Sequence, residues 1–92
     1  MRWLNVYRPG DRVPPHCDAV GDLQFLLCLQ GPQSPKTGGQ TFIGDTIVPL
    51  QTGDALLWRA TTLVHGMTPI ASDAFGPLEA SRVVFVLRYK AA

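Results

Sequence analysis

The chain has 92 residues, of which 46% are hydrophobic, so residues 1–92 have room for a single domain around one core. Eight basic and seven acidic residues leave a formal net charge of +1, which excludes binding to a nucleic-acid backbone by charge alone. Two cysteines are too few for a disulfide scaffold, and the sequence contains neither a signal peptide nor a long apolar span, so we expect a soluble, cytoplasmic protein.

Short apolar segments follow one another along the chain, interrupted by glycine, proline and aspartate, and none keeps a helical period for three turns. This pattern predicts β-strands. We expect them at residues 3–7, around His16, and at 22–29, 40–43, 46–50, 55–60, 63–70 and 82–90, with a polar loop at 30–39. About eight short strands predict an all-β double-stranded β-helix, or jelly roll, rather than an immunoglobulin-like sandwich.

Three side chains suited to binding a metal stand out: His16, Asp18 and His65. His16 and Asp18 are two positions apart, so an extended backbone projects them to the same face. His65 is the only other histidine, on a later predicted strand that a jelly roll can bring beside this pair. Two histidines and one carboxylate form the facial triad of non-haem Fe(II) enzymes. The alternative is a hydrogen-bonded loop pair and an unrelated core histidine, because His-x-Asp often occurs by chance.

The last predicted strand carries two arginines, Arg82 and Arg88, on the same face as Val84 and Val86. An inward-facing arginine is costly unless an anion meets it, and the guanidinium matches a carboxylate with two parallel hydrogen bonds. A dicarboxylate ligand would therefore suit both arginines. The alternative turns this face to solvent and leaves the core to the opposite face, which begins with Val83.

The first predicted strand offers two polar groups that could orient a carboxylate. Asn5 and Tyr7 share a face with Trp3 and supply an amide and a phenol at two-residue spacing. As isolated residues they carry little information, because tyrosine is common in strands and asparagine in turns.

The order and spacing of these residues resemble the AlkB-type oxygenases along nearly the whole chain. The resemblance rests on Asn5-Val6-Tyr7 with Pro9-Gly10, His16-Cys17-Asp18, Trp58, His65-Gly66-Met67 and the strand from Arg82 to Arg88. It implies three iron ligands, His16, Asp18 and His65. It also implies contacts to the cosubstrate 2-oxoglutarate, with Tyr7 and Arg82 at the distal carboxylate and Asn5 and Arg88 near the carboxylate that chelates the metal. Trp58 would line the pocket, although a large aromatic on a strand is more often core.

The sequence departs from the AlkB pattern in two ways. Val84 stands where the family has asparagine between the two arginines, so one cosubstrate contact is missing or supplied otherwise. The chain begins at the first core strand, so we expect a minimal core without the N-terminal nucleotide-recognition lid. A looser similarity to prolyl-4-hydroxylase-like oxygenases, through Gly38-Gly39-Gln40-Thr41-Phe42, leaves the substrate open among methylated nucleic acid, peptide and small molecule.

The sequence therefore predicts an Fe(II)- and 2-oxoglutarate-dependent dioxygenase that uses O₂ to hydroxylate a C–H bond and releases succinate and CO₂. AlkB-like oxidative demethylation is one form of this reaction. The alternatives are a prolyl-hydroxylase-like peptide or small-molecule hydroxylase and a non-catalytic, cupin-type metal-binding module. We also expect that a second copy or a partner chain could cover the open sheet edges.

Overall fold

The computed structural model describes residues 2–19, 21–31, 38–71 and 82–90, in which it contains eight β-strands and no helix. They are β1 (Arg2–Tyr7), β2 (Val13–His16), β3 (Leu23–Gln30), β4 (Thr41–Ile43), β5 (Thr46–Val48), β6 (Ala55–Trp58), β7 (His65–Met67) and β8 (Arg82–Tyr89). The predicted all-β architecture of about eight short strands is confirmed. Within the described ranges, no helix could cross a membrane.

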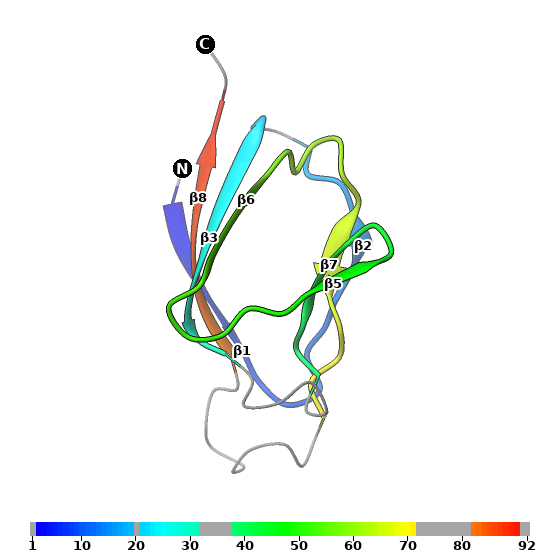
Figure 1. The fold of residues 1–92 in the computed structure, drawn as a ribbon, viewed down its shortest axis with the longest axis vertical. Helices are drawn as coiled ribbons and strands as arrows, with labels where there is room; N and C mark the ends of the chain where they lie inside the picture. The colour runs from blue at the N-terminus through cyan, green and yellow to red at the C-terminus, as the bar shows by residue number, and fades with distance from the viewer. Residues whose placement is uncertain (1, 20, 32–37, 72–81, 91–92) are drawn as a thin grey trace.

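The strands form two four-stranded sheets, with the orders β1-β8-β3-β6 and β2-β7-β4-β5, in which all neighbours are antiparallel. Figure 1 shows the two sheets facing each other, with the chain crossing repeatedly from one to the other. Every functional residue predicted above lies on one of these strands or, in the case of Asp18, just after one. The space between the sheets is therefore where the predicted site residues can meet.

The largest error in the predicted strands is at residues 63–70, where the strand β7 spans only His65–Met67. Before it, the backbone N–H of Leu63 donates to the carbonyl of Arg59, so this segment forms a turn. After it, the backbone N–H of Ile70 donates to Asp11, which lies outside the sheet ladders. The apolar pattern of residues 63–70 therefore predicts a longer strand than the backbone hydrogen bonds of this segment allow. The predicted loop at 30–39 lies mostly outside the described residues.

The core is built on the sheet β1-β8-β3-β6. Its two central strands, β3 and β8, pair along almost their whole lengths. Their inward residues alternate with outward ones, and Cys28, Val84 and Val86 are the largest side chains that are fully buried. Arg82 is only 3% exposed on the same inward face. The prediction that the closing strand turns its arginine face inward is confirmed, and the solvent-facing alternative is wrong.

The outer face of the sheet β1-β8-β3-β6 is apolar and partly open to solvent. Leu4 on β1 and Leu57 on β6 are 58% and 57% exposed, and Tyr89 at the end of β8 is 47% exposed. Apolar surfaces of this kind are common at contact sites between proteins. The expected partner chain or second copy at the sheet edges stays a prediction.

Val84, at the position of the AlkB asparagine, is 1% exposed and packs in the core cluster with Cys28 and Val86. We expect Val84→Asn to lower the free energy of unfolding by at least about 2 kcal/mol, because it removes buried apolar surface and buries an amide among apolar neighbours. The control is Val83→Asn on the opposite, half-buried face. Chemical denaturation measures both, and equal stabilities of the two variants would contradict this account of the core.

Candidate active site

The two histidines meet because the strands that carry them are neighbours. His16 ends β2, His65 begins β7, and the two residues are opposite each other in the antiparallel register, with ring centroids 4.4 Å apart. Gly66 follows His65 where a Cβ would collide with the carbonyl oxygen of Val13 and the ring of Phe42. The close packing of β7 between β2 and β4 thus requires a glycine directly after His65.

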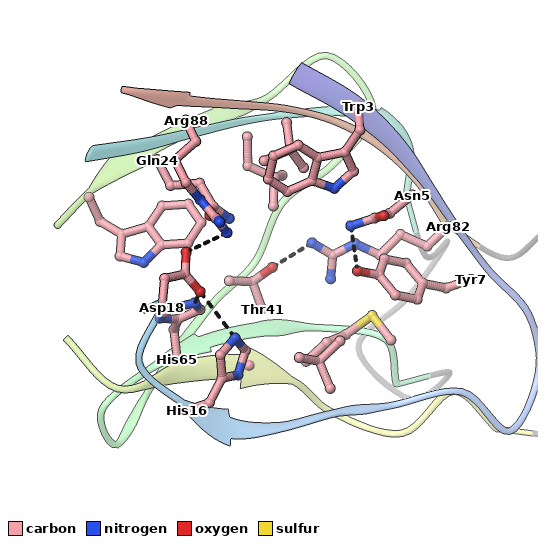
Figure 2. Close-up of a pocket in the computed structure, with 16 residues that line it drawn as sticks. Trp3, Asn5, Tyr7, His16, Asp18, Gln24, Thr41, His65, Arg82 and Arg88 are labelled. Carbon is pink, nitrogen blue, oxygen red and sulfur yellow. Dashed lines mark hydrogen bonds and ion pairs between the residues drawn. The ribbon is translucent and has the colours of Figure 1, made fainter. Parts of the chain in front are cut away.

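Asp18 lies two residues beyond β2, held by a 2.8 Å hydrogen bond from its backbone N–H to the carbonyl of Ala60. Its Oδ1 atom is 3.3 Å from His16 Nε2 and 3.2 Å from His65 Nε2. One ligand atom from each of the three residues lies within 4.8 Å of the others. Figure 2 shows the three side chains converging at one end of the pocket.

The remaining ring nitrogens orient both imidazoles. Nδ1 of His16 lies 2.8 Å from the carbonyl oxygen of Pro14, and Nδ1 of His65 lies 2.8 Å from that of Leu63. A carbonyl can only accept, so each Nδ1 carries a hydrogen, and in the neutral imidazole Nε2 is then the nitrogen that offers its lone pair on the side of Asp18. Backbone carbonyls commonly orient metal-binding histidines in this way.

The donor set fits a divalent cation. Neutral imidazoles would place two lone pairs opposite a carboxylate oxygen, and a cation between these three groups would be attracted to all of them. Two nitrogens and one carboxylate on one side of a site match the facial arrangement of non-haem iron centres. The side chains of Asp18 and His65 are 6% and 7% exposed, whereas that of His16 is 42% exposed, so the site opens to solvent past His16.

Arg88 contacts the carboxylate of Asp18 directly. Its Nη2 donates to Asp18 Oδ2 at 2.9 Å and to Gln24 Oε1 at 3.2 Å, and its guanidinium lies over the Trp3 ring, 4.9 Å from the centroid. The ion pair fixes which oxygen of Asp18 faces the histidines. Arg88 therefore positions a candidate metal ligand, next to the place that the AlkB resemblance implied for it.

Arg82 has a different environment. It is buried, and Nη1 donates to the carbonyl of Gly39 at 2.9 Å while Nη2 donates to Thr41 Oγ1 at 2.5 Å. Its buried Nε has no hydrogen-bond partner, and no carboxylate pairs with it, among the residues that the structure describes. Burial lowers the pKa of Arg82 from its usual value, the cost of an uncompensated internal cation.

Tyr7 and Asn5 lie beside Arg82. The guanidinium carbon of Arg82 is 5.9 Å from the centroid of the Tyr7 ring, and the Tyr7 hydroxyl accepts a 3.1 Å hydrogen bond from Asn5 Nδ2. Burial raises the pKa of Tyr7, although the neighbouring arginine opposes this. The phenol is therefore neutral at physiological pH and keeps its hydroxyl hydrogen for donation to a bound acceptor.

Comparisons with known proteins identify the fold of the chain. No protein-family model matches the chain, and no curated protein matches it. Among solved structures, an RmlC-like cupin protein from Desulfovibrio desulfuricans is similar, with a TM-score of 0.61 and 19% sequence identity. The fold is a jelly roll. The alignment covers 92% of this chain but 66% of that protein, so the chain spans slightly less than two thirds of its length.

Within this jelly roll, all seven predicted site residues line one cavity of about 180 Å³. The candidate metal ligands lie at one end, on and after β2 and on β7, and Arg82, Tyr7 and Asn5 lie toward the other end, on β8 and β1 (Figure 2). The rest of the lining is mostly apolar and includes Trp3, Val13, Leu26, Trp58, Met67 and Val86. The cavity can therefore hold a metal together with an elongated anion.

Sequence reasoning missed two polar residues of this cavity, Gln24 and Thr41. Gln24 is buried on β3, where it pairs in register with Arg88 and accepts from it. A glutamine on the inward face of an apolar strand was the available signal, because a buried amide needs a partner. Thr41 follows Gly38-Gly39-Gln40, and only the fold brings its hydroxyl to Arg82.

Proposed function

We propose that the protein is an Fe(II)- and 2-oxoglutarate-dependent dioxygenase that hydroxylates a C–H bond of its substrate. The observation that carries this proposal is Arg82, a buried cation with an unpaired Nε that lines the same cavity as His16, Asp18 and His65. An internal guanidinium without a described acidic partner calls for a bound anion. The neighbouring donor set calls for a divalent metal. A metal-chelating dicarboxylate meets both requirements.

Each residue has a role in this proposal. His16, Asp18 and His65 hold the metal, and Arg88 fixes the orientation of Asp18. When bound, Fe(II) with 2-oxoglutarate and O₂ supplies the oxidative chemistry that couples C–H hydroxylation to the release of succinate and CO₂. Arg82 takes the distal carboxylate of the cosubstrate, with hydrogen bonding from Tyr7, and Asn5 holds the Tyr7 hydroxyl. The apolar walls exclude water from the reaction.

The proposal also includes the direction from which the substrate reaches the metal. His16 is the most solvent-exposed of the three ligands, so the substrate would approach past β2. Hydroxylation of an N-methyl group would release formaldehyde, as in AlkB-type demethylation of nucleic acid. Hydroxylation of a peptide or small molecule, as in prolyl-hydroxylase-like enzymes, would leave the hydroxyl in place. In both cases the chain's own residues bind metal and cosubstrate in the same way.

The second candidate function is a non-catalytic metal-binding module of cupin type. The likeness of the fold to an RmlC-like cupin protein favours it, because jelly rolls of this kind serve both binding and catalysis. In such a module the three-residue cluster would hold a metal, and Arg82 would pair with an anion that is not turned over.

Succinate release separates the two functions. We expect the purified chain, given O₂ and 2-oxoglutarate, to form succinate slowly without substrate, and only when Fe(II) is added. Chromatography of the reaction mixture measures this, with samples lacking either Fe(II) or 2-oxoglutarate as controls. Metal binding without any succinate would contradict the enzymatic proposal and support the binding module. Addition of N-methylated nucleotides and proline-containing peptides would then show which class accelerates turnover.

A further inference from the structure

Trp58 is a cavity residue with an unusual environment. It is the last residue of β6, is 6% exposed, and lines the cavity between the sheets. Its ring meets the imidazole of His65 edge to face, with centroids 5.2 Å apart and an interplanar angle of 73°. The indole is thus in contact with a candidate metal ligand, at the metal end of the cavity.

The indole N–H of Trp58 is buried and has no hydrogen-bond partner among the described residues. This nitrogen can only donate, and leaving such a donor buried and unpaired is destabilising. Trp3, the other tryptophan of the cavity, instead presents its ring face to the guanidinium of Arg88. A tryptophan that served only to fill the core would turn its nitrogen to an acceptor or to solvent.

The neighbouring side-chain acceptors interact with groups other than Trp58. Gln24, opposite Trp58 in the strand register, accepts from Arg88 through its Oε1. Asp18 accepts a hydrogen bond from Arg88 through Oδ2, and its Oδ1 faces both histidines. No described residue accepts from the indole N–H of Trp58, and an oxygen of a ligand bound in the cavity can supply that acceptor.

Nε of Arg82 and Nε1 of Trp58 are both buried donors without a hydrogen-bond partner among the described residues, and both residues line the same cavity. In Figure 2, Arg82 lies with Tyr7 and Asn5 on one side of the pocket, whereas His65, the residue that Trp58 contacts, lies with Asp18 on the other. Donors toward both ends match a ligand with oxygen acceptors at both ends. The charged donor suits the carboxylate far from the metal, and the neutral donor suits the oxygen of a carboxylate already bound to it.

We propose that the indole N–H of Trp58 donates a hydrogen bond to the metal-side carboxylate of the cosubstrate, a role that rests on the proposed function. Trp58 is then a ligand-binding residue that selects a 2-oxo acid over a simple ketone. It orients the carboxylate from the side of His65, while Arg82 holds the far end. Trp58 also belongs to the hydrophobic core cluster, as the sequence favoured, and the binding role is proposed in addition to that core role.

Nuclear magnetic resonance of the full chain loaded with diamagnetic Zn(II) tests this role. We expect 2-oxoglutarate to move the indole N–H resonance of Trp58 downfield and slow its exchange with solvent. Trp58→Phe and Trp3→Phe identify the two indole peaks. The matched ligand is 4-oxopentanoate, which keeps the ketone and the distal carboxylate but has a methyl group in place of the metal-side carboxylate. It should leave the Trp58 resonance almost unmoved.

Affinity measurements provide the second arm. Trp58→Phe keeps an aromatic ring but loses the N–H, so we expect it to weaken 2-oxoglutarate binding about tenfold and to leave 4-oxopentanoate binding unchanged. An unmoved Trp58 resonance in the wild-type protein saturated with 2-oxoglutarate would overturn the proposal, as would an equal shift with 4-oxopentanoate. Failure of the metal-loaded wild-type protein to bind 2-oxoglutarate at all would instead refute the proposed function, and the role of Trp58 with it.

Discussion

Asp18→Ala is expected to abolish iron binding at micromolar metal concentrations, with a loss of affinity of at least about 100-fold. Asp18 is the only anionic member of the three-residue cluster, and its Oδ1 lies within 3.3 Å of both imidazole nitrogens. Without it, two neutral imidazoles and the guanidinium of Arg88 would surround the metal position. A cation held by neutral ligands beside an arginine that has lost the Asp18 carboxylate lacks charge compensation. Calorimetric titration with Fe(II) under anaerobic conditions measures the loss.

Two further variants separate charge from folding. Asp18→Asn keeps an oxygen donor and removes the charge, so we expect an affinity between those of the wild type and the alanine variant. Asp45→Ala removes an exposed carboxylate in the turn between β4 and β5, and it should bind iron as the wild type does. Thermal unfolding of each variant establishes that it is folded. An Asp18→Ala protein with unchanged iron affinity would show that the ligand assignment is wrong.

The residues of the candidate site could be predicted from the sequence because their signals are local. His16 and Asp18 are two residues apart, and Arg82 and Arg88 share one face of a single strand, so extended geometry alone aligns each pair. The return of His65 to the first pair required a topology, which the count of short strands supplied. In the structure, β2 and β7 are neighbours and bring the two histidines together.

Other features depend on contacts that no local pattern contains. The carboxylate of Asp18 and the guanidinium of Arg88 are 70 positions apart in the chain, and their ion pair makes Arg88 a positioning residue. The unpaired N–H of Trp58 becomes visible only once the partners of the surrounding acceptors are known. The ends of β7 depend on turns whose hydrogen bonds involve Arg59 and Asp11, so an apolar run could not define them.

Arg82→Ala is expected to raise the dissociation constant for 2-oxoglutarate by about 30-fold to 5,000-fold, equivalent to roughly 2–5 kcal/mol for the loss of a buried charge-assisted pair. Arg82 is held by Gly39 and Thr41, and its Nε remains available in the cavity. The metal ligands lie on other strands, so metal affinity without cosubstrate should change little. Titration of the Mn(II)-loaded protein with 2-oxoglutarate measures the effect.

Graded variants test whether Arg82 acts through its fork of donors as well as its charge. Arg82→Lys keeps a point charge without the fork, so we expect an intermediate affinity for 2-oxoglutarate. Thr41→Val removes the acceptor of Nη2 and should weaken binding by a smaller factor, because the guanidinium keeps its bond to Gly39. Arg59→Ala, an exposed arginine after β6, is the matched control and should bind normally. If a folded Arg82→Ala protein kept the wild-type cosubstrate requirement, the closing strand would have no part in anion binding, and the argument from its inward face would fail.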